Sequence, residues 1–104
     1  MEEKLLKIIN TYGVMPQLKY FQSEIFELNE AIIRYEELQE KALAELDCYP
    51  EWNDEYKKHI VEEIADVTVM LKQFQYYYGI EDKEIEEVMK YKVERQLERI
   101  NRGE

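Results

Sequence analysis

The sequence has few residues that break a chain or cross-link it. Its 104 residues include three glycines, two prolines and a single cysteine, Cys48. One cysteine cannot form a disulfide within the chain, which indicates a reducing compartment. Because Gly and Pro mark most turns, their scarcity favours long, uninterrupted secondary structure.

Long apolar runs and positive charge are also scarce. No stretch approaches the roughly 18 apolar residues of a membrane-spanning helix, and the segment after Met1 has no basic region followed by an apolar run. Fourteen Lys and Arg against 24 Asp and Glu give a net charge of -10, which repels phosphate backbones and anionic lipid. We therefore expect a cytoplasmic protein that binds neither nucleic acid nor membrane, and whose charge suits cations.

The composition is nevertheless that of a folded domain. Hydrophobic residues make up 45% of the chain and aromatic residues 12%, which is too apolar for a disordered acidic tail. A chain of this length predicts one domain, residues 1–104. Area scaling predicts a folded surface of about 6,200 Å².

The apolar residues repeat at helical spacing. Breaks at Gly13 with Pro16, from Cys48 to Asp54, and at Gly79 divide the chain into four segments. Helices are predicted over about 2–12, from Pro16 onward, from Asn53 or Asp54 to 78, and over about 82–100. The expected inward stripes are Leu18, Phe21, Ile25, Leu28 and Ile32; Ile60, Ile64, Val67, Leu71, Phe74 and Tyr78; and Ile85, Val88, Met89, Leu97 and Ile100.

These patterns predict an all-α fold, an antiparallel bundle of about four helices of which two are long. A helix of about 25 residues spans roughly 37 Å. Helices of that length with apolar residues on more than one side cannot all be covered within a chain of 104 residues. We therefore expect a homodimer or a homotetramer to complete the bundle.

Four carboxylates stand where apolar residues are expected. Glu63 lies within the stripe of the third segment, and Asp66 lies at its edge; Glu24 lies between Phe21 and Leu28, with Glu27 three residues on. Burial of an unpaired carboxylate is costly, and four of them close together repel one another. The group therefore needs protons, a Lys or Arg partner, or a divalent metal.

Oxygen ligands favour one class of metal. Carboxylates suit Mg²⁺, Mn²⁺ or Ca²⁺, whereas Zn²⁺ sites usually draw on Cys and His. The sole histidine, His59, precedes Glu63 by four residues and could line the site. A di-iron centre is excluded because its Glu-x-x-His motif is missing: Tyr56 stands three residues before His59. The alternative is that the acids flank the stripe and reach water, paired with Lys19, Lys58 or Arg34.

The fourth segment carries a basic face. Lys92, Gln96 and Arg99 recur at helical spacing and place two cations and an amide on one side. Such a face can bind phosphate oxygens, and Arg can do so with two hydrogen bonds. The alternative is a solvated helix end favoured by the helix dipole.

Together these residues resemble the MazG-like family of all-α nucleoside triphosphate pyrophosphatases. The family's ExxE pair is similar to Glu24-Ile25-Phe26-Glu27, and its EExxD group to Glu62-Glu63-Ile64-Ala65-Asp66. A Gly-Ile-Glu step resembles Gly79-Ile80-Glu81, and the family's later basic residues resemble Lys92 and Arg99. The resemblance covers about residues 16–100. Two departures are the 35 residues between Glu27 and Glu63, a longer gap than is common, and Gln96 where many relatives have Asn.

The resemblance implies hydrolysis of a nucleoside triphosphate, either NTP or dNTP, to its monophosphate and pyrophosphate. Glu24, Glu27, Glu63 and Asp66 would hold Mg²⁺ or Mn²⁺, with Glu62 as an additional candidate ligand. Lys92 and Arg99 would bind the phosphates, with Gln96 as a further candidate, from the same chain or from a neighbouring subunit. Tyr20, Trp52, Tyr76 and Tyr77 are available to stack on a base.

Two other functions remain open at this point. One is a non-catalytic helical interaction module whose acids form a solvated or DNA-mimicking surface. The other is a family member that keeps the metal site and has lost turnover.

Overall fold

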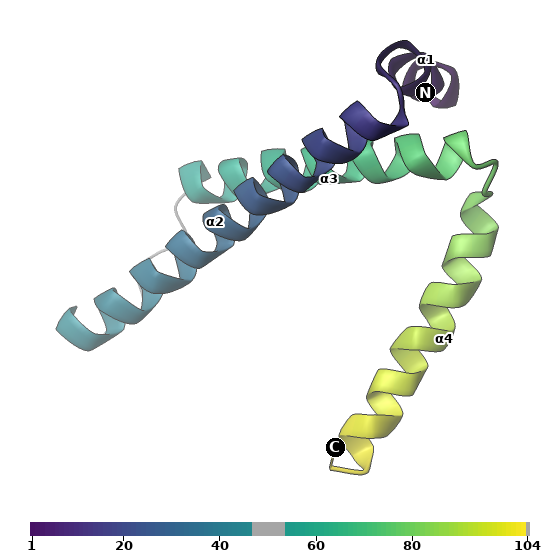
Figure 1. Ribbon diagram of the computed structural model, residues 1–104. Helices are drawn as coiled ribbons and strands as arrows, with labels where there is room; N and C mark the ends of the chain where they lie inside the picture. The colour runs from purple at the N-terminus through teal and green to yellow at the C-terminus, as the bar shows by residue number, and fades with distance from the viewer. Residues whose placement is uncertain (47–53, 104) are drawn as a thin grey trace.

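The computed structural model describes residues 1–46 and 54–103, in which the chain forms four helices and no strand. They are α1 (Glu2–Tyr12), α2 (Val14–Leu46), α3 (Asp54–Tyr77) and α4 (Asp82–Asn101) (Figure 1). The predicted all-α fold with two long helices is confirmed. The predicted break at Cys48 and Pro50, the cap at Asn53 and the stacking candidate Trp52 lie outside the described residues. No described helix has the length and apolarity to cross a membrane.

Glycine ends α1, as the sequence predicts. Gly13 has a φ of 93°, which L side chains rarely adopt, and its N–H donates to the Ile9 carbonyl at 2.8 Å. Pro16 falls in the first turn of α2, where its missing N–H leaves no helical hydrogen bond unmade.

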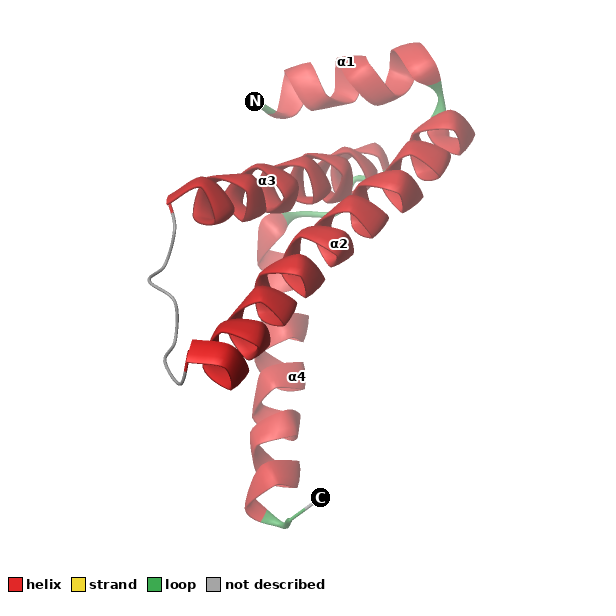
Figure 2. Cartoon of the chain, turned by 90° about the vertical axis from the view of Figure 1, so that its left-hand side faces the viewer, coloured by secondary structure: helices red, strands yellow, loops and turns green. Residues whose placement is uncertain are grey.

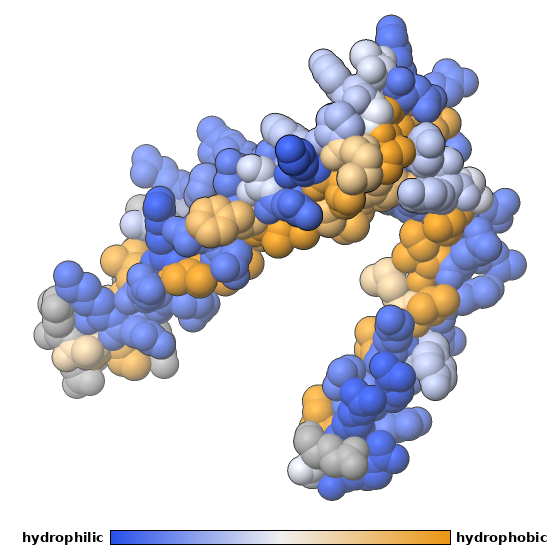
Figure 3. All heavy atoms as spheres, viewed as in Figure 1, coloured by the Kyte–Doolittle hydropathy of each residue, from blue (hydrophilic) through white to orange (hydrophobic). Residues whose placement is uncertain are grey.

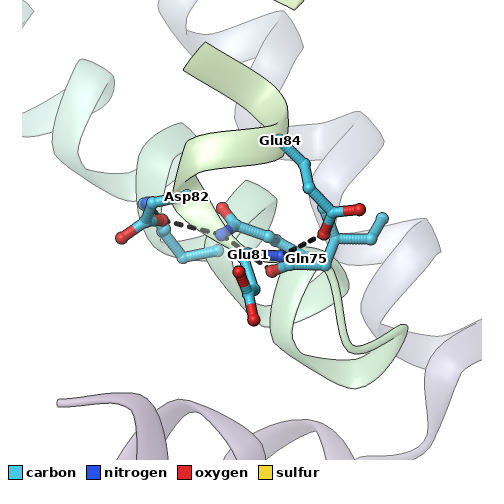
Figure 4. A network of polar contacts seen from close by, with 6 residues as sticks. Gln75, Glu81, Asp82 and Glu84 are labelled. Carbon is cyan, nitrogen blue, oxygen red and sulfur yellow. Dashed lines mark hydrogen bonds and ion pairs between the residues drawn. The ribbon is translucent and has the colours of Figure 1, made fainter. Parts of the chain in front are cut away.

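The junction between α3 and α4 is a Schellman turn around Gly79. Its φ is 68°, its N–H donates to Tyr76, and the N–H of Ile80 donates to the Gln75 carbonyl at 3.0 Å. The Gln75 amide donates to the Ile80 carbonyl at 3.1 Å and to Asp82 at 2.7 Å (Figure 4). The Glu81 N–H donates to the Glu84 carboxylate at 2.8 Å and starts α4. Together these hydrogen bonds define where α3 ends and α4 begins.

α2 and α3 run in opposite directions and pack along a seam (Figures 1 and 2). The rings of Phe21 and Phe74 meet edge to face at 5.6 Å near one end, and those of Tyr35 and Tyr56 lie 6.0 Å apart near the other. On each helix one series of buried and half-buried positions repeats in steps of three and four, as in coiled coils. The series is Phe21, Glu24, Leu28, Ala31, Tyr35, Leu38 and Ala42 on α2, and Ile60, Glu63, Val67, Met70 and Phe74 on α3.

α1 covers the end of this pair where α2 begins and α3 ends (Figure 2). Its buried residues are Leu5 and Ile9, and it packs mainly on α3. The core is therefore built from α1, α2 and α3.

The predicted inward stripes are wrong at several positions. Each long helix has two apolar faces, and only one of them meets the seam. The exposed positions of the predicted stripes of α2 and α3 are Leu18, Ile25, Ile32, Ile64, Leu71 and Tyr78. None of the described residues of α4 is buried, and its predicted stripe, from Ile85 to Ile100, faces solvent. Past its junction with α3, α4 packs on no other helix within the described residues, and its apolar side faces the opening between it and the α2–α3 pair (Figure 3).

The chain is consequently less compact than area scaling predicts. Its accessible surface is 8662 Å², against the roughly 6,200 Å² expected for this mass. Its radius of gyration is 18.1 Å, whereas a compact domain of about 100 residues has about 13 Å. The difference comes from α4 and from the second faces of α2 and α3.

Candidate metal centre

Three of the predicted acids come together where α2 crosses α3. Glu24 of α2 and Glu63 and Asp66 of α3 each place a carboxylate oxygen within 4.8 Å of the other two. Opposite oxygen ligands of one divalent cation at 2.0–2.6 Å lie about 4–5 Å apart. Glu24 and Glu63 occupy seam positions, so the packing of α2 on α3 is what brings the group together.

Two oxygens of this group are buried without a partner. Glu24 is 4% exposed and Glu63 is 8% exposed, and the Oε2 atom of each has no hydrogen-bond donor among residues 1–46 and 54–103. Buried polar atoms are almost always hydrogen-bonded in native structures, because leaving one unpaired costs its full desolvation energy. These oxygens are therefore candidates to take up a proton or to bind a cation.

Protonation can reduce the repulsion among these carboxylates and the cost of burying them. Burial raises the pKa of Glu24 above its ordinary value; the hydrogen bond with Tyr20 lowers it, and the charges of Glu27, Asp66 and Glu63 raise it. Burial also raises the pKa of Glu63, with further contributions from Glu27 and Asp66, against a smaller opposing effect of His59. Both shifts have the sign expected for carboxylates crowded in a low-dielectric seam.

The other predicted acids lie beside the three. Glu27 is exposed and acts on Glu24 and Glu63 through its charge, but it is not part of the convergent group. With Glu63 it lines a second cavity of about 380 Å³ that also includes His59. Glu62 is exposed and contributes weakly to the raised pKa of Glu63. The His59 Nδ1 atom lies 3.9 Å from Glu63 Oε1, so a protonated His59 pairs with that carboxylate.

The predicted phosphate-binding residues stand apart from the acids. Lys92, Gln96 and Arg99 lie on α4, which makes no packing contact with α2 in the described chain. One chain therefore does not bring its basic face to its own carboxylates (Figure 1).

Sequence reasoning missed Gln73 and the interaction of Tyr20 with Glu24. Gln73 is 2% exposed, and its Oε1 atom is buried without a partner. The signal was the spacing: Gln73 follows Asp66 by seven residues and Tyr20 precedes Glu24 by four, so each pair shares a helix face. Tyr20 was considered only as a stacking surface.

The arrangement can hold an oxygen-seeking divalent cation. Its donors are carboxylate oxygens from two rigid helices, a set that suits Mg²⁺ and Mn²⁺. Comparison with protein-family models, with curated proteins and with solved structures finds no match to this chain.

Proposed function

We propose that this chain is a metal-dependent nucleoside triphosphate pyrophosphohydrolase of the MazG-like type, acting in the cytoplasm. The reaction adds water across the anhydride between the α- and β-phosphates and releases a nucleoside monophosphate and pyrophosphate. The observation that carries the proposal is the convergence of Glu24, Glu63 and Asp66 with two buried, unpartnered oxygens.

The donor set fits Mg²⁺, with Mn²⁺ as an alternative. Glu24, Glu63 and Asp66 would hold the cation, and Glu27 and Glu62, whose charges act on Glu63, are further candidate ligands. A bound divalent cation supplies positive charge to the phosphates and lowers the pKa of water. Glu27, exposed and acting on Glu24 and Glu63 through its charge, would be a candidate to accept a proton from an incoming water.

The net charge constrains how a substrate arrives. A chain of charge -10 repels a free nucleoside triphosphate. A nucleotide already complexed with Mg²⁺ carries less negative charge and brings a cation to the carboxylates. The substrate is therefore the metal complex of an NTP or a dNTP.

The phosphate-binding side chains come from a second copy of the chain. Lys92, Gln96 and Arg99 of one chain do not reach its own carboxylates, and α4 carries an uncovered apolar face. The accessible surface exceeds the area expected of a compact chain by about 2,400 Å², whereas a standard interface buries about 800 Å² per partner. A homodimer or homotetramer that covers α4 fits both observations.

Leu97→Glu tests this assembly, because Leu97 is 54% exposed on the apolar side of α4. Light scattering after size exclusion is expected to give an oligomer for the wild type and a monomer, with lost activity, for the variant. Glu98→Gln is the control and keeps the assembly. A wild-type monomer that hydrolyses nucleotides would rule the assembly out.

The direct test of function is a product assay. Purified protein with Mg²⁺ or Mn²⁺ is given canonical, deoxy and modified triphosphates, and monophosphate and pyrophosphate are measured. Glu63→Gln is expected to lower kcat by about 100-fold or more, because it removes a charge from the cation site. Glu37→Gln, an exposed acid of α2, is the matched control and keeps wild-type activity. Orthophosphate as the product, or equal rates in both variants, would contradict the proposal.

A non-catalytic interaction module is the second candidate, and α4 is the feature that favours it. None of the described residues of α4 is buried, as expected of a helix that binds a different protein. Such a module would release no pyrophosphate and would melt at the same temperature with and without Mg²⁺. A family member that has lost turnover would be stabilised by Mg²⁺ and release no product.

A further inference from the structure

A cavity of about 550 Å³ opens from the carboxylate group toward α1. Asp66 belongs to both: it supplies one of the three convergent oxygens and lines the cavity. Ligand pockets for small molecules usually measure about 300–1,000 Å³. Side chains from three helices line this one, among them Ile8 and Tyr12 of α1, Gln17 and Tyr20 of α2, and Gln73 of α3.

Gln73 is the unusual member of the lining. Its side chain is almost fully buried. Within the described part of the chain its Oε1 atom has no hydrogen-bond donor, and its Nε2 atom donates only to the Met70 sulfur, at 3.6 Å. Sulfur is a weak acceptor, so both ends of the amide are poorly satisfied. A buried amide in this state destabilises the fold, and an apolar side chain of the same length would not.

Gln75, two residues on, is also a buried amide of α3, but its amide is hydrogen-bonded within the chain. It is 6% exposed, and its Nε2 atom donates to the Ile80 carbonyl and to Asp82. The same helix therefore satisfies one buried amide within the chain and leaves the other open at a cavity wall.

The lining also defines the charge of an occupant. Apart from Asp66, which meets the cation site, the lining residues are neutral, and none is Lys, Arg or His. A phosphate group would find no cation there. The two amides and the Tyr12 and Tyr20 hydroxyl-bearing rings instead suit a neutral, flat molecule with hydrogen-bonding edges.

We propose that this cavity takes the nucleobase of the substrate and that the Gln73 amide determines specificity by pairing with an edge of the base. An amide offers one acceptor beside one donor, and a base that has a donor next to an acceptor can pair with both atoms. The inference rests on the proposed function, because it places the phosphates at the Asp66 end. It identifies the substrates as nucleotides with such an edge, and it excludes inorganic triphosphate as a good substrate.

Nucleoside binding tests the cavity separately from catalysis. Metal-free protein labelled with ¹⁵N is titrated with uridine, cytidine, adenosine and guanosine, and with ribose as the control, while the side-chain amide signals are followed by NMR. At least one nucleoside is expected to shift the Gln73 amide signal, and ribose is expected to leave it unchanged. Gln73→Met is expected to weaken that binding about tenfold or more.

Gln75→Met is the matched control, since it also removes a buried amide from α3. It is expected to keep nucleoside affinity at temperatures where it is folded. Gln73→Met is expected to melt at or above the wild-type temperature, so lost binding in that variant is not lost folding. The wild-type titration alone decides the case if a variant fails to fold.

The outcomes separate this inference from the proposed function. Mn²⁺ binding and pyrophosphate release with no nucleoside shift at Gln73, or equal affinity in Gln73→Met, would overturn the cavity assignment and leave the enzyme in place. Nucleoside binding without pyrophosphate release would support the cavity and contradict the hydrolase.

Discussion

Buried polar groups are paired differently at the α3–α4 junction than in the α2–α3 seam and the cavity beside it. At the junction with α4, Gln75 donates twice and Asp82 also pairs with Lys72 (Figure 4). In the seam and the adjoining cavity, Glu24, Glu63 and Gln73 each keep an oxygen without a partner. The junction pairs its polar groups within the chain, whereas the seam and the cavity hold buried oxygens with no donor in the described residues. This difference is the basis of the proposals that the seam binds a cation and the cavity a nucleobase.

Metal should produce the largest effect, and only in the seam. Mg²⁺ or Mn²⁺ at 100 times its dissociation constant stabilises a folded chain by about 2.7 kcal/mol. For a domain of this size that corresponds to a rise of about 10 °C or more in Tm, measured by differential scanning fluorimetry. Glu63→Gln is expected to lose the rise, and Asp82→Asn at the junction is expected to keep it. An equal rise in both variants would show that the metal acts elsewhere.

Exchange of the two amides gives the next largest effect. Gln75→Met removes the side-chain donor to the Ile80 carbonyl and one of the two donors to Asp82, which keeps Lys72, so it should cost about 1–2 kcal/mol of unfolding free energy. Gln73→Met removes a group that is already unsatisfied and should cost nothing or stabilise. Urea unfolding of both variants measures the contrast. Equal losses would mean that Gln73 has a structural partner after all.

The pH dependence of stability should have opposite signs in the two regions. Glu24 and Glu63 have pKa values raised above 4.5, the ordinary pKa of a glutamate. Their contribution to the free energy of unfolding is therefore present below pH 4.5 and is lost as the pH rises through the pKa of the folded state. Hydrogen bonds from Lys72 and Gln75 lower the pKa of Asp82, so its contribution is present above pH 3.8 and is lost as pH falls.

Thermal melts of metal-free protein between pH 3 and pH 8 test both signs. Glu24→Gln should reduce the fall in Tm toward neutral pH, and Asp82→Asn should reduce the fall in Tm at acid pH. Saturating Mn²⁺ should remove the first decline and leave the second. If Mn²⁺ does not change the fall in Tm toward neutral pH, that fall does not come from Glu24 and Glu63.

Much of the fold could be predicted from the sequence because its signals are local. Gly13, Pro16 and Gly79 fix helix ends through their own backbone geometry, so their positions alone were sufficient. The face of each helix was harder, because apolar residues on two sides give two stripes of similar strength. Ile64 and Leu71 belong to the stripe that the chain leaves uncovered.

The candidate site was predicted in part for the same reason. Glu24 and Glu63 stand among apolar residues at helical spacing, and both are buried in the seam. The separation of Glu27 from the group, and the cavity beside Gln73, depend on how α2 crosses α3 and how α1 covers them. These features depend on distances between helices, which cannot be predicted from the spacing of residues within one helix.

Calorimetric titration with Mn²⁺ at neutral pH tests the central claim most directly, that Glu24, Glu63 and Asp66 hold a divalent cation. The account predicts saturable binding in the wild type and in Glu37→Gln, and at least about tenfold weaker binding in Glu63→Gln. Identical isotherms for the wild type and Glu63→Gln, or no saturable binding in either, would contradict it.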